Sequence, residues 1–157
     1  MTLDIVIATY KRPAALRRCL EALATQTVLP GRVIVVDDHS PEPVTAAAFR
    51  DLAPLTVDVL SMPQNGGPAP ARNAGVAAST ADVVLFVDDD VVADARLVER
   101  HTAAHARGES LAVIGPLAAP ADWHPTPWNR WEAETLRVEY DRMERGVYAP
   151  TWRQFFT

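Results

Sequence analysis

Two short runs of acidic residues each follow an apolar segment of the chain. They are Asp37-Asp38-His39-Ser40 and Asp88-Asp89-Asp90. If the chain stays extended there, Asp88 and Asp90 point the same way, about 6.6 Å apart. Like charges at that separation repel by roughly 2.5 kcal/mol at an effective dielectric of about 20, and a divalent cation would offset this repulsion. The second run therefore predicts a site for Mg²⁺ or Mn²⁺, which take carboxylate oxygens and share substrate phosphates.

Both runs also have a purely structural interpretation. The three consecutive acids could form a solvated turn and cap a helix that starts near Asp94. The Asp37–Asp38 pair could form an acidic turn in which Asp38 or Ser40 caps the next helix. In the functional interpretation, one carboxylate of this pair accepts hydrogen bonds from a base or a ribose.

A loop rich in glycine and proline, Asn65-Gly66-Gly67-Pro68, enters a predicted helix. A helix N-terminus favours phosphate, and Arg72 would add a fixed positive charge. The spacing of a G-x-G-x-x-G fingerprint is absent. Lys11 is the only lysine of the chain, so a Walker A loop is excluded.

Histidines and tryptophans give weaker signals. His101 and His105 share a helix face, but the glutamate of an H-E-x-x-H motif is missing, which argues against zinc. Trp123, Trp128 and Trp131 could stack on a sugar ring or pack against helices.

Apolar strands alternate with helical segments along the chain. We predict strands at 3–8, 32–36, 56–60, 82–87 and 111–114, and helices at 13–27, 42–52, 70–79, 94–107 and 129–145. The strand at 82–87 is the most apolar, so we expect it to be the most buried. Cys19 lies in the apolar series of the first helix, which predicts a buried structural thiol. Alternation of this kind predicts a three-layer α/β fold with a mainly parallel, doubly wound sheet.

Bulk composition sets further limits on function. The chain has 157 residues, a hydrophobic content of 48% and a formal net charge of -5, which argues against a nucleic-acid partner. No run approaches the ~20 apolar residues of a transmembrane segment. The start of the chain lacks a basic signal-peptide region. We therefore expect a cytoplasmic protein, with contact with the inner membrane surface left open.

Four motifs in order carry a family resemblance. Ile5–Pro13, Val35–Ser40, Ala71–Gly75 and Leu85–Asp90 resemble the family 2 glycosyltransferases, which have the GT-A nucleotide-diphospho-sugar transferase fold. The resemblance covers nearly the whole chain. It implies a nucleotide-sugar-binding core at 1–115, followed by a Pro/Trp-rich segment and helix at 116–157, within one structural domain overall.

The resemblance also implies roles for individual residues. Those implied to bind the nucleotide-sugar are Thr9, Tyr10, Arg12, Asp37, Asp38, Arg72, Asp88 and Asp89. Of these, Asp38 with Asp37 would read the base, and Asp89 would touch the ribose. Asp88 and Asp90 match the two acids of the family's DxD motif, which holds Mg²⁺ or Mn²⁺ against the donor diphosphate.

The expected function is inverting transfer from a nucleotide-diphospho-sugar to an acceptor hydroxyl of a saccharide, lipid or small molecule. Family members usually continue past the segment that resembles Trp152–Thr157, so the catalytic base is expected beyond Thr157. One alternative is a nucleotide-sugar-binding module without turnover. Another is a receiver-type signalling domain, although such domains need the acidic pair after the first strand and a lysine after a late strand.

Overall fold

A sheet of four parallel strands organises the first part of the chain. The computed structural model describes residues 1–108, 111–118 and 124–147, and the chain divides into two units, Met1–Leu111 and Ala112–Thr157. The strands of the first unit are β1 (Leu3–Thr9), β2 (Val33–Asp37), β3 (Val57–Ser61) and β4 (Val83–Phe86). They pair in the order β3-β2-β1-β4, and every pairing is parallel.

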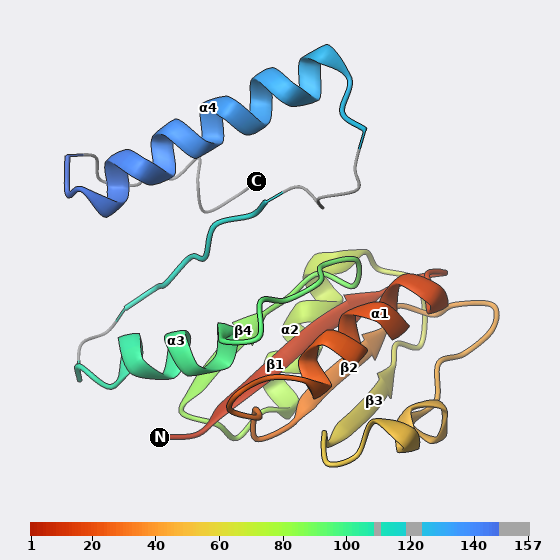
Figure 1. The fold of residues 1–157 in the computed structure, drawn as a ribbon. Coiled ribbons are helices and arrows are strands. Elements are labelled where there is room, and N and C mark those ends of the chain that lie inside the picture. Colours follow the sequence, from red (N-terminus) through yellow and green to blue (C-terminus); the bar gives the residue numbers. More distant parts are fainter. Residues whose placement is uncertain (109–110, 119–123, 148–157) are drawn as a thin grey trace. The chain divides into compact units, whose positions relative to one another are not determined.

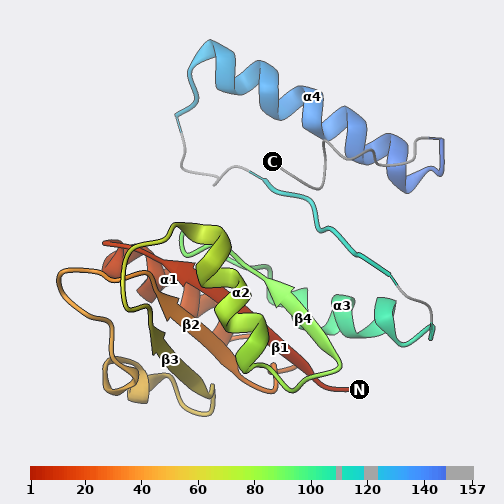
Figure 2. The ribbon, with the colours of Figure 1, turned by 180° about the vertical axis from the view of Figure 1, so that it is seen from behind.

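Helices cover both faces of this sheet. They are α1 (Pro13–Ala24), the 3-10 helix η1 (Ala46–Leu52), α2 (Pro68–Ala78) and α3 (Leu97–His105). Figure 1 shows α1 in front of the sheet, and Figure 2 shows α2 in front of it when the molecule is seen from behind. The predicted three-layer, doubly wound α/β architecture is confirmed.

Successive side chains of β1 point to opposite faces of the sheet and pack in two separate hydrophobic clusters. Ile5 and Ile7 pack with Leu16 of α1 and Val98 of α3 on one face. Val6 packs on the other face, in the cluster that includes Ala71 of α2. A central strand that is buried on both faces is apolar throughout, which explains the continuous apolar run of the sequence.

The strand order reverses at β1. The chain adds β2 and then β3 on one side of β1 and returns to add β4 on the other side. Ligands of doubly wound sheets bind beyond the carboxyl ends of the strands at such a reversal. The register places Thr9 opposite Asp37, and the Asp38 amide donates to the Thr9 carbonyl at 2.9 Å. The first two predicted motifs therefore meet at this edge.

Two strand predictions need correction. The segment 82–87 was expected to be the most buried strand, but β4 is half-buried and the side chain of Phe86 is 50% exposed. Among the described strands β4 pairs only with β1, so it lies at the edge of the sheet. Leu111–Ile114 is no strand in the structure, although its composition is typical of one.

Two helix predictions are also corrected. The segment 42–52 holds only η1, because Pro43 disfavours helical backbone at the preceding residue and the Val44 amide donates to the Asp37 carboxylate. The third long helix starts at Leu97 and not at Asp94. Its Val98 amide is capped by the buried side chain of Gln26, while Asp94 accepts from the Arg96 amide.

In the second unit, the described residues contain one helix, α4 (Pro127–Glu144), which begins after the N-cap Thr126. Trp128 and Trp131 are exposed, with ring centroids 5.0 Å apart. Trp123 and the segment Trp152–Thr157 lie outside the described residues. In the part of the chain that the structure describes, no helix combines the length and apolarity needed to span a membrane. Sugar stacking by the tryptophans stays a prediction.

Close packing of α2 on the sheet depends on Gly75. A Cβ atom at this position would lie 2.4 Å from Cγ1 of Val6 and 3.3 Å from Cγ2 of Val36. We expect Gly75→Ala to lower the free energy of unfolding, because overpacking costs about 1–3 kcal/mol and exceeds the gain of about 1 kcal/mol in helix propensity. Thermal and urea unfolding, followed by circular dichroism, measure this change.

The matched control is Gly115→Ala, since no atom lies within 4 Å of the position of its added Cβ. We expect this variant to unfold like the wild type. A Gly75→Ala protein that is as stable as the wild type would contradict the close approach of α2 to the sheet.

Candidate functional site

A hollow of about 520 Å³ lies at the carboxyl edge of the sheet. We call it the sheet-edge hollow. Its lining consists of Ala8, Thr9, Tyr10, Arg12, Asp38, Asn65, Gly67, Pro68, Arg72, Asp88, Asp89 and Asp90. Ala8 and Thr9 end β1, and the other residues follow one of the four strands or belong to α2, so distant parts of the sequence converge here. Small-molecule sites typically enclose about 300–1,000 Å³, and this hollow falls within that range.

The three consecutive acids do not stay extended, as the sequence interpretation assumed. The chain turns at Asp89 and Asp90, and the Val91 amide donates to the Asp88 carbonyl at 3.2 Å. The turn exposes the side chains of Asp88 and Asp90, at 60% and 55%, while that of Asp89 is only 7% exposed. The acids thus divide into two exposed side chains and one buried side chain.

Asp89 connects the end of β4 to the end of β1. Its carboxylate accepts from the Thr9 hydroxyl at 2.7 Å and pairs with the Arg12 guanidinium at 3.3 Å. A buried carboxylate needs such partners, because burial without them is costly. Asp89 was expected to touch a ribose. In the structure it holds the turn in place and positions Arg12.

The two exposed acids are each paired with an arginine. Arg72 of α2 donates to Asp88 at 2.6 Å, and Arg12 donates to Asp90 at 2.9 Å. The arginine side chains are themselves 35% and 58% exposed. Both basic residues predicted for the site therefore lie in the sheet-edge hollow beside its acids.

Asp38 holds the loop that precedes α2. Its carboxylate accepts from the amides of Gly66 and Gly67 at 2.9 and 2.7 Å, and the Asn65 side chain donates to its carbonyl at 3.1 Å. The loop amides that the sequence assigned to a phosphate are thus engaged by a protein carboxylate. Gly67 has a φ of 87°, a backbone conformation that glycine adopts readily.

Asp37 lies outside the sheet-edge hollow, although it was predicted to help read a base. It is 1% exposed, and its carboxylate accepts from the amides of Ser40 and Val44, both at 3.1 Å. The Ser40 hydroxyl in turn accepts from the Lys11 amide at 3.0 Å, which links the loops after β1 and β2. Asp37 therefore shapes these loops.

Cys19 of α1 contacts the backbone of the acidic turn. Its side chain is fully buried, as predicted, and the thiol donates to the Asp88 carbonyl at 3.6 Å. Burial raises the pKa of this thiol to about 12, and the charges of the neighbouring acids act in the same direction. A thiol with this pKa stays protonated at neutral pH and acts as a structural donor.

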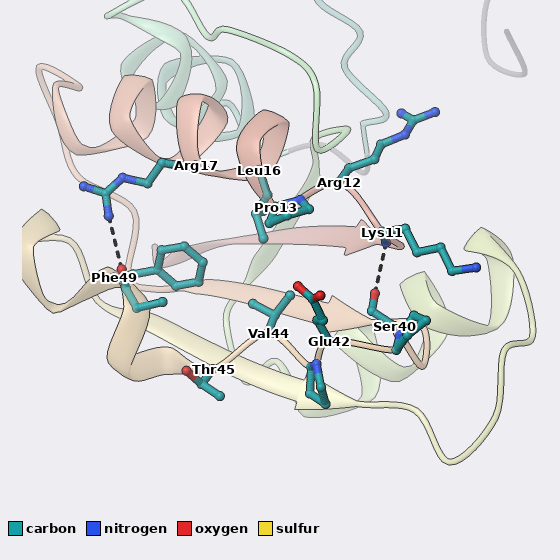
Figure 3. Close-up of a pocket in the computed structure, with 13 residues that line it drawn as sticks. Lys11, Arg12, Pro13, Leu16, Arg17, Ser40, Glu42, Val44, Thr45 and Phe49 are labelled. Carbon is teal, nitrogen blue, oxygen red and sulfur yellow. Dashed lines mark hydrogen bonds between the residues drawn. The ribbon is translucent and has the colours of Figure 1, made fainter.

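A second hollow, of about 530 Å³, lies between the start of α1 and the segment that leads into η1. Figure 3 shows Glu42, Val44 and Phe49 facing Pro13 across it, whereas the side chain of Arg12 points away. Arg12 lines both hollows, and the acids of the second acidic run line only the sheet-edge hollow. The sheet-edge hollow is therefore the one that combines both acidic strand ends with arginines.

Sequence reasoning missed Asn65 and Pro68 as lining residues. The Asn-Gly-Gly-Pro loop was recognised, but only its backbone was considered. Its position directly after a parallel strand would have indicated that Asn65 reaches the carboxyl edge. His39 follows the Asp37–Asp38 pair in the first acidic run. It has a φ of 64° and its Nδ1 lies 3.2 Å from the Met62 carbonyl, outside the lining of the sheet-edge hollow.

The fold and this edge together define a doubly wound α/β domain with an acidic, arginine-containing hollow at the reversal of strand order, where ligands of such sheets bind. Residues 4–155 match the sequence profile of Glycosyl transferase family 2. The chain belongs to this family, as its four motifs indicated. A receiver-type signalling domain is thereby set aside.

Several relatives share most of this chain. The pre-mycofactocin glycosyltransferase of Mycobacterium tuberculosis is 35% identical over 143 residues, which cover 91% of this chain and 29% of that protein. The validoxylamine A glucosyltransferase of Streptomyces hygroscopicus subsp. limoneus is 35% identical over 115 residues, which cover 71% of this chain and 25% of that protein.

The fold is similar to that of solved glycosyltransferase structures. S. aureus TarS 1-349 in complex with UDP-GlcNAc superimposes with a TM-score of 0.61 at 26% sequence identity, covering 68% of this chain and 32% of that chain. The same TarS region has also been solved in complex with UDP. The present chain spans about a third or less of its curated relatives, 33% and 29% for the first two proteins.

The division of the acidic run predicts different effects on stability. We expect Asp89→Ala to lower the free energy of unfolding by about 1–3 kcal/mol, because the buried Thr9 hydroxyl loses its acceptor. Asp88→Ala and Asp90→Ala are the matched controls. Their ion pairs are exposed, so we expect changes within about 1 kcal/mol.

Urea unfolding of the three variants in metal-free buffer measures these differences. Equal destabilisation by all three substitutions would mean that Asp89 has no special structural role in the turn.

Proposed function

We propose that the sheet-edge hollow binds a nucleoside-diphospho-sugar and that the chain is the donor-binding domain of a glycosyltransferase. The observation that carries this proposal is the convergence of Thr9, Arg12, Asp38, Arg72 and the acidic turn on one hollow of suitable size. The fold shared with TarS, which has been solved with UDP-GlcNAc, supports the same class of ligand.

The nucleoside would lie toward Tyr10 and Asp38. Tyr10 is 38% exposed at the rim, and Lys11 Nζ lies over its ring, 4.7 Å from the centroid, so a base or ribose would contact the ring face opposite Lys11. Each carboxylate oxygen of Asp38 accepts one loop amide and retains a second lone pair. That capacity suits an N–H donor on a base, and the two complexes of TarS favour uracil.

Asp88 and Asp90 would hold Mg²⁺ or Mn²⁺. Their carboxylates are the exposed acids of the turn, and hard cations prefer oxygen ligands of this kind. Within the described ranges, no group of three or more His, Cys, Asp or Glu side chains is arranged to hold a metal ion. Two protein carboxylates would suffice where water and substrate phosphates complete the shell. When bound, the cation would stabilise the leaving diphosphate as a Lewis acid.

Transfer would proceed by a single displacement with inversion. The acceptor hydroxyl oxygen forms a bond to the anomeric carbon as the bond from that carbon to the diphosphate oxygen breaks. The nucleoside diphosphate leaves with the electron pair, and a general base receives the hydroxyl proton. Arg12 and Arg72 would bind the diphosphate oxygens, for which guanidinium groups are well shaped.

The base would have to be a group other than the four acids of the sheet-edge hollow. Asp38 already accepts from loop amides, and Asp88, Asp89 and Asp90 are paired with arginines. An acid that is bound to a cation or an arginine is a poor proton acceptor. The acceptor itself would be a saccharide, a lipid or a small molecule that carries a free hydroxyl.

Binding of the donor is expected to require metal. We expect UDP-GlcNAc or UDP-glucose to bind in Mn²⁺ and to lose at least tenfold in affinity in EDTA, where the diphosphate meets a lining with four carboxylates and only two guanidinium groups. Asp88→Ala and Asp90→Ala should each reproduce most of that loss. Isothermal titration calorimetry measures the affinities.

Asp82→Ala is a suitable control, because this exposed acid precedes β4 at the opposite end of the strand. It should bind the donor like the wild type. Equal donor affinity in EDTA and in Mn²⁺ would refute the metal-dependent site.

Recognition of the base is expected to depend on Asp38. We expect Asp38→Ala to weaken UDP by about tenfold or more, through loss of the base contact and release of the Gly66–Gly67 loop. Ribose 5-phosphate, which lacks the base, should be affected much less. If calorimetry finds equal losses for both ligands, Asp38 does not read the base.

A further inference from the structure

The acids proposed to hold a cation are already neutralised by protein cations. Arg72 Nη2 lies 2.6 Å from Asp88 Oδ1, and Arg12 Nη1 lies 2.9 Å from Asp90 Oδ2. Both arginines line the sheet-edge hollow, together with these acids. Any second cation that binds Asp88 and Asp90 must therefore compete with the two guanidinium groups.

These ion pairs are weak enough to exchange. The paired side chains are exposed by 35% and 60% in the first case, and by 58% and 55% in the second. Exposed pairs of this type contribute little to stability, so water, a metal ion or a phosphate can replace either partner. Asp89 differs, because it is 7% exposed and also accepts from Thr9. Arg12 thus keeps one anchoring acid when it releases Asp90.

The charges of the hollow disfavour each ligand when it binds alone. Its lining carries four carboxylates against two guanidinium groups, an excess of negative charge that repels a diphosphate. A divalent cation that binds alone must displace the arginines from Asp88 and Asp90 and leave them without an anion. When both ligands bind, the arginines gain the diphosphate and the acids gain the cation.

We propose that Arg12 and Arg72 are exchangeable counter-ions that couple the binding of nucleotide and metal. In the empty site they neutralise Asp90 and Asp88. In the loaded site they transfer to the diphosphate, to which guanidinium groups bind in bidentate fashion. The coupling is reciprocal, so nucleotide raises the affinity for metal by the same factor by which metal raises the affinity for nucleotide. This inference rests on the proposed donor site and adds the mechanism by which that site binds each ligand more weakly alone than together.

Calorimetric titrations with Mn²⁺ alone, UDP alone and UDP in saturating Mn²⁺ test the coupling. For the wild type we expect Mn²⁺ to raise the UDP affinity by more than about tenfold, within the usual range of such couplings. In Arg72→Ala we expect Mn²⁺ alone to bind roughly two- to fivefold more tightly, as loss of an exposed competing pair allows. The coupling should fall to about threefold or less. Arg12→Ala should act in the same direction.

Arg96→Ala is the matched control, since Arg96 forms an exposed pair with Glu99 outside the sheet-edge hollow. Its coupling should equal that of the wild type. Arg72→Lys distinguishes the contribution of the guanidinium group from that of its charge, because lysine keeps the charge but cannot bind in bidentate fashion. We expect Arg72→Lys to recover less than half of the lost coupling, measured as the logarithm of the factor by which Mn²⁺ raises the UDP affinity. Full recovery by lysine, or unchanged coupling in Arg72→Ala, would overturn the proposal.

A measurement on the wild-type chain tests the proposal even if the variants fold poorly. Guanidinium NMR signals of Arg12 and Arg72 should shift on addition of Mg²⁺ alone and move again when UDP follows, while those of Arg96 stay constant. Static Arg12 and Arg72 signals would overturn the exchange. Metal-dependent UDP binding without these changes would leave the donor site intact and refute only the exchange of the arginines. Failure of UDP to bind under any condition would refute both proposals.

Discussion

The Asp89 carboxylate is buried, and the arrangement of the carboxyl edge depends on the partners that neutralise it. Its two partners, the Thr9 hydroxyl and the Arg12 guanidinium, both come from the end of β1. A buried carboxylate that lost them would cost several kcal/mol, so the turn after β4 is held against β1. With Asp89 directed inward, its neighbours Asp88 and Asp90 are directed toward solvent. One buried carboxylate and its two partners thus set the direction of all three acids.

The other two acids of the edge, Asp37 and Asp38, divide in the same way into one that only holds a loop and one that also lines the sheet-edge hollow. Asp37 and Asp38 are adjacent in sequence and both are buried, yet they serve different loops. Asp37 accepts from the amides of Ser40 and Val44, whereas Asp38 holds the loop before α2 and still lines the sheet-edge hollow. Backbone amides satisfy these two carboxylates, so the loops around the hollow are ordered before any ligand arrives. Such preorganisation lowers the entropic cost of binding.

Much of this edge could be predicted, because parallel strands bring their carboxyl ends together whatever the details of packing. The convergence of Thr9, Asp38 and the acidic turn followed from that rule. The rule says nothing about which of three consecutive acids turns inward, since the answer depends on the Thr9 hydroxyl across the strand boundary. The rule also does not predict that Asp37 turns away from the hollow, because its amide partners lie in a loop of irregular shape. Hydrophobicity located β4 but overestimated its burial, since an apolar run does not reveal whether a strand has neighbours on both sides. It also predicted a strand at Leu111–Ile114 that the structure lacks.

The arginines give this acidic edge its chemical character. A hollow lined by carboxylates alone would hold metal tightly and repel diphosphates, and one lined by arginines alone would hold any phosphate. Pairing the two groups at 2.6 and 2.9 Å makes each the competitor of the other's ligand. Either ligand alone then gains little, because it must first break an ion pair whose other half is left unsatisfied. In the donor site that we propose, selectivity for a metal-complexed diphosphate would follow from this competition between residues of the four motifs.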